Sequence, residues 1–144
     1  DWGASLKSAL RSKPRYIMVG EIRTPDTASE VLRAATSGHL VLSTIHANNV
    51  TDAITSVVKY AAAGGMSEDL AYDLFSRGML GVLHQTLVGT AIKKAAVSFL
   101  FANPDTSKGD QVRGIIKSGR INLGTSIETQ MTRMARGLPL FIDV

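Results

Sequence analysis

Residues 16–46 read YIMVGEIRTPDTASEVLRAATSGHLVLSTIH. Two short apolar runs rich in β-forming residues, Tyr16–Val19 and Leu40–Ile45, stand near the two ends of this stretch. Between them, from Thr24 or Asp26 to Ser37, apolar residues recur at spacings of three and four, which predicts an amphipathic helix. Strand, helix and strand in this order predict a βαβ unit with parallel strands and a right-handed crossover. The unbroken first run further predicts a strand covered on both faces.

The rest of the chain continues with helix and strand signals. Pro14 ends a first helix, because the residue before a proline disfavours helical backbone. Ser67 followed by two acidic residues marks the start of a later helix. The expected elements are helices over about 2–13, 51–62 and 67 to between 81 and 84, a hairpin with strands at 86–88 and 96–101, and short helices over about 110–117 and 124–136.

Composition limits the class of protein. The chain has 144 residues, of which 44% are apolar and 19% charged, which fits one globular domain and excludes a disordered or collagen-like chain. It has no cysteine, so disulfides, cysteine-bound zinc and a thiol nucleophile are excluded. No apolar run reaches the roughly 18 residues of a membrane span, and the first residues lack a signal-peptide pattern. We therefore expect a cytoplasmic location.

The charge pattern argues against nucleic acid as a partner. Sixteen basic and 12 acidic residues give a net charge of +4, no basic block stands out, and only 6% of the residues are aromatic. Nucleic-acid-binding modules gather Lys and Arg on one stripe and interleave aromatic residues where they bind single strands. We expect no nucleic-acid partner and keep a nucleic-acid translocase only as an alternative.

Polar residues follow both expected strands. Gly20 and Glu21 come directly after the first strand, and Thr44 and His46 end the second run. Because parallel strands bring their carboxyl ends to one edge of a sheet, Glu21 and His46 are expected to face one crevice, the usual ligand site of α/β proteins. In nucleotide hydrolases such a carboxylate orients the attacking water and supports Mg²⁺. The structural alternatives stay open, because a Glu here also caps helices or forms salt bridges and a strand-end His also holds loops.

The motifs of this region resemble those of one enzyme family. The residues concerned are Leu10, Arg11 and Pro14, the run Met18–Arg23, Thr27, and the run Ser37–Ala47. In them the chain resembles the secretion ATPases of type II and type IV systems, hexameric motors that include pilus-assembly, pilus-retraction and conjugal-transfer enzymes. The first run is similar to their Walker B element and the second to their His box. The resemblance implies an α/β fold, the carboxyl-terminal part of a RecA-like P-loop NTPase domain with a hairpin and trailing helices.

The resemblance also implies roles for individual residues. Glu21 matches the catalytic Walker B glutamate, which would hold the attacking water and reach Mg²⁺ through water. His46 matches a histidine that senses the γ-phosphate. Gly20, Arg23 and Thr44 are expected to contact the nucleotide, with Arg23 contacting either a phosphate or an aspartate of the fold. The implied cofactors are ATP and Mg²⁺.

Some positions stand apart from the catalytic pattern. His39 also matches the family, but it lies at the start of the second strand, so a structural role is expected. Lys13 and Arg15 flank Pro14 where the family commonly has an acidic residue after the proline, and Thr24 replaces a usual Asp. These departures concern local salt bridges.

The P-loop pattern Gly-x-x-x-x-Gly-Lys-Ser/Thr does not occur in residues 1–144. Because the family carries this loop upstream of the Walker B strand, we expect the chain to be the carboxyl-terminal part of a longer protein and to be inactive alone. Residues 1–102 are expected to form the carboxyl-terminal half of the RecA-like core. Residues 103–144 are expected to form a helical extension of the same domain.

The resemblance finally implies partners. The parent protein would be a hexamer of identical subunits, cytoplasmic and peripheral at the inner membrane through platform proteins of a pilus or secretion machine. Pilus extension, pilus retraction, type II export and conjugation share these motifs, so the sequence does not distinguish among the machines. Two alternatives from other classes stay open: a non-catalytic interaction or scaffold domain, and a RecA-like nucleic-acid translocase.

Overall fold

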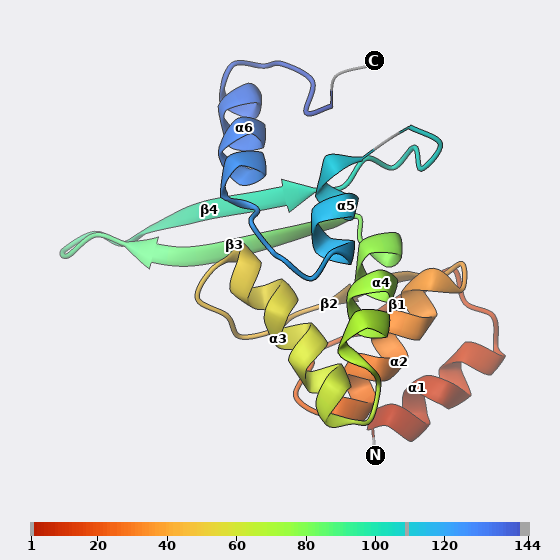
Figure 1. The fold of residues 1–144 in the computed structure, drawn as a ribbon. Helices are drawn as coiled ribbons and strands as arrows, with labels where there is room; N and C mark the ends of the chain where they lie inside the picture. Colours follow the sequence, from red (N-terminus) through yellow and green to blue (C-terminus); the bar gives the residue numbers. More distant parts are fainter. Residues whose placement is uncertain (1, 109, 142–144) are drawn as a thin grey trace.

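The computed structural model describes residues 2–108 and 110–141 (Figure 1). Helices and strands alternate along most of this part of the chain. The order is α1 (Trp2–Arg11), β1 (Tyr16–Val19), α2 (Pro25–Thr36), β2 (Leu40–Ser43), α3 (Val50–Ala63), α4 (Glu68–Gly78), β3 (Gly81–Val88), β4 (Lys94–Phe101), α5 (Gln111–Lys117) and α6 (Gly124–Ala135).

The βαβ unit predicted from residues 16–46 is confirmed. β1 and β2 pair in parallel, with Tyr16 opposite Leu40, and α2 forms the crossover between them. α2 begins where the sequence predicts because the Oγ1 atom of Thr24 accepts a hydrogen bond from the backbone N–H of Thr27. Pro25 suits the first helical position, where a backbone N–H has no partner within the helix.

Two apolar clusters hold the elements together. The larger core joins α2, α3, α4, α5 and β4, and its fully buried side chains include Ile54, Leu100, Ile116 and Leu123. A smaller cluster joins α1, β1 and α2 around Leu6 and Ile17. Because Ile116 and Leu123 belong to the larger core, the segment around α5 shares one core with the preceding elements.

The prediction that β1 is covered on both faces is wrong for the described chain. Ile17 and Val19 are buried against α1 and α2, whereas Tyr16 is 72% and Met18 82% exposed. Leu42, the partner of Met18 on β2, is also exposed. We call Tyr16, Met18 and Leu42 the open sheet face. The apolar pattern of β1 marks a second face that no element of the described residues covers.

The predicted end of the helix after Ser67 is also wrong. α4 ends at Gly78 rather than between residues 81 and 84, and β3 already begins at Gly81. Antiparallel pairing with β4 explains the difference, because its register runs without interruption from Gly81 opposite Phe101 to Val88 opposite Lys94. Tertiary pairing thus decides the conformation of residues whose local pattern fits a helix. The predicted hairpin itself is confirmed, with longer strands.

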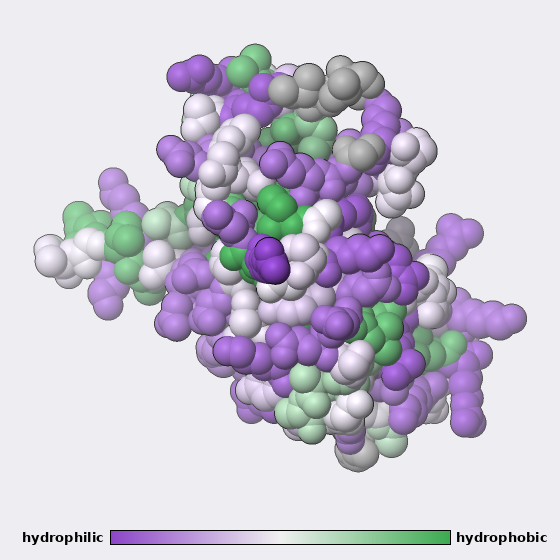
Figure 2. Space-filling view, viewed as in Figure 1, coloured by the Kyte–Doolittle hydropathy of each residue, from purple (hydrophilic) through white to green (hydrophobic). Residues whose placement is uncertain are grey.

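The hairpin projects from the rest of the fold (Figure 1). Near its base, Val82 and Leu100 pack into the larger core. Along the hairpin several apolar side chains are exposed: Leu83, Leu87, Val88, Ile92 and Val97. Figure 2 shows green areas on the projecting arm. Gly89 has a φ of +110°, and a Cβ at this position would lie 2.3 Å from the carbonyl oxygen of Ile92. The turn therefore requires glycine.

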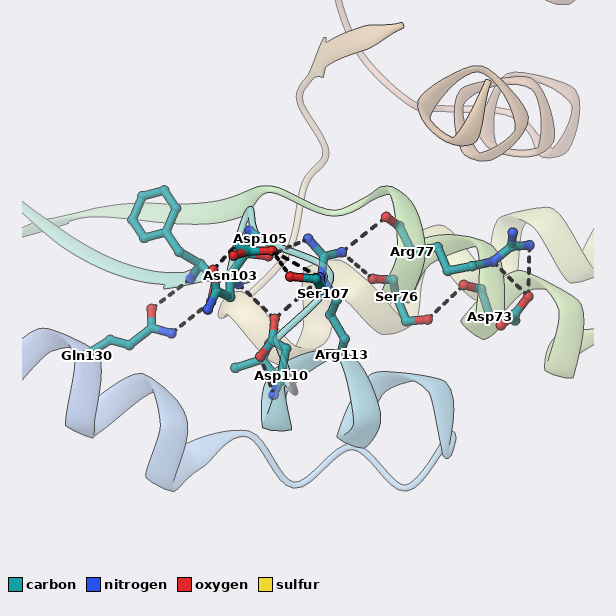
Figure 3. Close-up of polar contacts among 11 residues, drawn as sticks. Asp73, Ser76, Arg77, Asn103, Asp105, Ser107, Asp110, Arg113 and Gln130 are labelled. Carbon is teal, nitrogen blue, oxygen red and sulfur yellow. Dashed lines mark hydrogen bonds and ion pairs between the residues drawn. The ribbon is translucent and has the colours of Figure 1, made fainter. Parts of the chain in front are cut away.

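Arg113 fastens α5 to the end of α4 (Figure 3). Its guanidinium donates hydrogen bonds to the backbone carbonyls of Ser76, Arg77 and Asn103. Asp110, the N-cap of α5, lies 3.4 Å from the same guanidinium. The carbonyls at the end of α4 thus gain a charged partner, which stabilises the packing of the two helices.

Gln130 fastens α6 to β4 (Figure 3). Its Oε1 atom accepts a hydrogen bond from the backbone N–H of Phe101, and its Nε2 atom donates to the carbonyl of the same residue. The Gln130 amide therefore satisfies both backbone groups of Phe101 on the free edge of β4, as a neighbouring strand would. The two short helices predicted near residues 110–117 and 124–136 are confirmed, and these contacts fix their places.

Candidate functional site

The carboxyl ends of β1 and β2 meet at one pocket. The strand pairing continues beyond the two strands, because the N–H of Ile22 donates to the carbonyl of Thr44 at 2.9 Å. The pocket has a volume of about 360 Å³, and it is lined by Glu21, Ile22, Arg23, Ile45, His46 and Tyr60. The parallel pairing thus brings Glu21 and His46 together, as the positions of the strand ends predict.

Glu21 is held between two basic side chains. Its Oε1 atom lies 3.0 Å from Nε2 of His46, and its Oε2 atom pairs with Nε of Arg23. The Glu21 side chain is 20% exposed, whereas the side chains of His46 and Arg23 are 94% and 74% exposed. The carboxylate is therefore the shielded member of this group, and its two partners are largely exposed to solvent.

The other residues predicted to contact a nucleotide lie at or beside the pocket. Arg23 lines the pocket and pairs with Glu21. The Oγ1 atom of Thr44 donates to the carbonyl of Gly20 at 2.5 Å, which ties the two strand ends together. In the part of the chain that the structure describes, Gly20 and Thr44 lie beside the pocket and outside its lining.

His39 lies at the opposite end of β2. Its Nδ1 atom is 2.5 Å from the backbone carbonyl oxygen of Pro14. The ring thereby joins the loop before β1 to the start of β2, next to the hydrogen bond from the N–H of Leu40 to the carbonyl of Arg15. This geometry suits the structural role that its sequence position suggests.

The pocket combines one carboxylate with two basic side chains. Within residues 2–108 and 110–141, no group of three or more His, Asp or Glu side chains is placed to hold a metal ion. Mg²⁺ in phosphate-transfer sites needs only one or two carboxylates, because water and phosphate oxygens supply its other ligands. Glu21 fits such an indirect contact, and the donors of Arg23 and His46 suit phosphate oxygens.

Two residues at or near the pocket were not found by sequence reasoning. Tyr60 of α3 lines the pocket. His84 of β3 has its Nε2 atom 3.1 Å from the carbonyl oxygen of Ala47, the residue after His46. No sequence signal marks either one, because Tyr60 fits an ordinary helix and His84 lies where the pattern predicts the end of a helix.

Known proteins are similar to this chain in both sequence and fold. The family described as Type II/IV secretion system protein matches residues 1–132. The chain belongs to this family. A twitching motility protein of Neisseria gonorrhoeae is 32% identical over 126 residues, which are 85% of this chain and 32% of that protein. The type IV pilus assembly ATPase PilB of Acinetobacter baylyi is 50% identical over 54 residues, which are 38% of this chain and 9% of PilB.

The fold agrees with this type II/IV secretion family. The crystal structure of the pilus retraction motor PilT with bound ADP matches the chain with a TM-score of 0.71 at 26% identity, over 93% of this chain and 36% of the PilT chain. The predicted fold class, part of a RecA-like α/β domain, is confirmed. The chain spans about a third or less of the length of these relatives. Among the described residues, no helix is both long and apolar enough to cross a membrane.

Proposed function

We propose that the chain supplies the catalytic glutamate and the phosphate-sensing histidine of a secretion or pilus motor ATPase. The observation that carries the proposal is the pairing of Glu21 Oε1 with His46 Nε2 at 3.0 Å, in a pocket at the ends of two parallel strands. Family membership supports it, since one relative is named an ATPase and another is a pilus motor with bound ADP.

The carboxylate of Glu21 would accept a hydrogen bond from water and orient it for attack on the γ-phosphate of ATP. Phosphoryl transfer depends mainly on such positioning and on charge compensation. A carboxylate has about four lone-pair sites, so Glu21 could accept the water beside its two present partners. The pair with Arg23 would keep the second carboxylate oxygen in place. Bound Mg²⁺ would add charge compensation at the phosphate oxygens, with Glu21 contacting it through water.

His46 is the more exposed of the two partners of Glu21. Its side chain is 94% exposed against 74% for Arg23, and contacts at such exposed sites contribute little to stability. We infer that the ring exchanges its contact with Glu21 for one with a phosphate oxygen when a nucleotide arrives. Loss of the γ-phosphate would return the ring to Glu21, which makes the position of His46 a report of the nucleotide state.

Gly20 and Thr44 would complete the nucleotide contacts from beside the pocket. A Cβ at Gly20 would meet nothing within 4 Å, so the backbone there is open to a ligand. The single hydroxyl hydrogen of Thr44 is donated to Gly20, so Thr44 would reach a phosphate through a water molecule that donates to its oxygen.

The chain alone is proposed to be inactive. Its sequence has no P-loop, whose backbone N–H groups and lysine hold the phosphates in this class of enzyme. The open sheet face also supports further structure in the working enzyme, because parallel sheets are normally covered on both faces. Residues 1–102 would then supply the catalytic half of the core and residues 103–144 an extension. The working enzyme would be a cytoplasmic hexamer, held at the inner membrane by platform proteins.

A carboxylate-to-amide change tests the proposal in the full-length protein that contains this chain. Glu21→Gln is expected to lower ATP hydrolysis about a hundredfold or more, because the amide keeps the shape but loses the charge that orients the water. ATP affinity is expected to stay within about threefold, since the lost interaction serves the transition state.

Glu30→Gln is the matched control. Glu30 lies on α2, outside the pocket, where its Oε1 atom pairs with Lys7 at 3.5 Å. This variant is expected to hydrolyse ATP at the wild-type rate. Turnover of Glu21→Gln within twofold of the wild type would refute the role of Glu21.

A further inference from the structure

We propose that His84, on the β3–β4 hairpin, is a positioning residue for His46. It acts through residues 46–49, which lie between β2 and α3 and are called the His46 loop below. The meaning of this contact for ATP hydrolysis rests on the proposed function, whereas the contact itself does not.

The contact joins two distant parts of the chain. Nε2 of His84 lies 3.1 Å from the carbonyl oxygen of Ala47, across 37 positions of sequence. Because a carbonyl only accepts hydrogen bonds, Nε2 must carry the hydrogen. His84 is half-buried on β3 opposite Ser98 of β4, so the hairpin restrains the ring.

Packing does little to hold the His46 loop. On one side His46 lines the Glu21 pocket of about 360 Å³. On the other, Asn48 and Asn49 line a second hollow of about 580 Å³ that extends to Ser98. A segment between two hollows has few apolar contacts, so its position depends on hydrogen bonds.

The hydrogen bonds that hold the loop lie on both sides of His46 along the sequence. Before it, Thr44 is tied to the end of β1 through the carbonyl of Gly20. After it, the carbonyl of Ala47 accepts from His84, and the backbone and side chain of Asn48 donate to Asp52 of α3. The bond from His84 holds the Ala47–Asn48 peptide plane, one residue beyond His46, from its carbonyl side, while the N–H of the same plane donates to Asp52. It comes from the hairpin rather than from the βαβ unit.

Removal of that bond should loosen the loop and move the imidazole of His46 from the 3.0 Å contact with Glu21. Catalysis is sensitive to such shifts, since a misplacement of about 1 Å can cost up to about a hundredfold in rate. The hairpin thereby controls the position of a pocket residue without touching the reacting atoms. A force on the projecting arm would reach His46 by the same bond.

Nuclear magnetic resonance of the ¹⁵N-labelled 144-residue chain tests the contact without any nucleotide. At pH 8 the ring nitrogen signals of His84 are expected to show a protonated Nε2; an unprotonated Nε2 overturns the proposal. His84→Leu removes the donor, and His84→Gln keeps an amide N–H at similar reach. The Leu variant is expected to shift the amide signals of residues 46–48 and to lower their order parameters from about 0.85 towards 0.6. The Gln variant is expected to keep wild-type values.

His39→Leu is the matched control. It also removes a contact between a histidine ring and a backbone carbonyl, at the other end of β2. This variant is expected to leave residues 46–48 unchanged. Unchanged signals in His84→Leu, or the same loss of order in His39→Leu, overturn the proposal.

The full-length protein then tests the consequence for catalysis. His84→Leu is expected to lower kcat about tenfold with KM for ATP within twofold, and His84→Gln to restore kcat to within twofold. Equal kcat in wild type and His84→Leu, despite a loosened loop, would show that the position of His46 does not matter. An inactive wild-type protein would refute the proposed function and leave the result from the labelled chain standing.

Discussion

Replacement of Gln130 by Met removes both hydrogen bonds that join α6 to β4 and keeps a side chain of similar length. In the structure, Oε1 accepts from the N–H of Phe101 and Nε2 donates to its carbonyl, each at 2.8 Å. Gln130 is only 5% exposed, so the contact is shielded from water. The variant leaves the two backbone groups of Phe101 without these partners in a region that admits little solvent.

The expected loss of stability follows from the two backbone groups of Phe101 that lose their partners. An unpaired buried backbone group costs about 1–3 kcal/mol, and we take the lower half of that range because Phe101 is only half-buried. Two groups together give about 2–4 kcal/mol. With a urea m-value of about 2 kcal/mol/M, the unfolding midpoint is expected to fall by about 1–2 M.

Urea unfolding of the 144-residue chain, followed by circular dichroism, measures this shift. Gln111→Met is the matched control, because Gln111 is exposed at the start of α5 and a surface change of this kind stays within about 0.5 kcal/mol. A midpoint for Gln130→Met within about 0.25 M of the wild type, at unchanged m-value, would refute the reasoning. The two bonds would then contribute nothing beyond what water supplies to Phe101.

The remaining predictions concern the pocket. His46→Ala is expected to lower ATP hydrolysis by the full-length protein about tenfold or more, while the melting temperature of the chain changes by less than about 2 °C, because a side chain 94% exposed buries little surface. If the melting temperature fell by many degrees while the activity per folded molecule stayed unchanged, His46 would have a structural role instead. Calorimetric titration of the 144-residue chain with ATP and Mg²⁺ is expected to show no micromolar binding, and a phosphate-release assay no turnover, because the P-loop contacts are not in its sequence. Micromolar affinity would require another phosphate cradle in this chain, for which the turns at Gly64 and Gly89 are the places to look.

The βαβ unit could be predicted because its local signals agree with its tertiary role. Thr24 caps α2 through its own hydroxyl, and Pro25 fits the first helical turn without help from distant residues. Parallel strands leave their carboxyl ends at one edge, so the meeting of Glu21 and His46 follows from order alone. The pairing of Arg23 with Glu21 does not follow, because several rotamers of a long exposed side chain are compatible with the same backbone.

The sequence does not show which residues far apart along the chain will contact one another in the fold. The apolar character of Met18 indicates a residue suited to burial, yet it is 82% exposed, because the pattern cannot say what covers it. Contacts such as His84 with Ala47 and Gln130 with Phe101 span 37 and 29 positions and leave no periodic trace. The start of β3 at Gly81 could not be predicted from the sequence for the same reason, because pairing with β4 defines it.

The open sheet face has a consequence for how the chain behaves at high concentration. Within the described residues, β1 and β2 form a two-stranded sheet, so each strand has one edge without a neighbouring strand. Beside these edges lie the exposed side chains of Tyr16, Met18 and Leu42. Free strand edges next to apolar surface recruit strands from other molecules. The isolated chain is therefore expected to self-associate through this small sheet at high concentration. A charged residue in place of Met18 is expected to delay aggregation without disturbing the buried side that carries Ile17 and Val19.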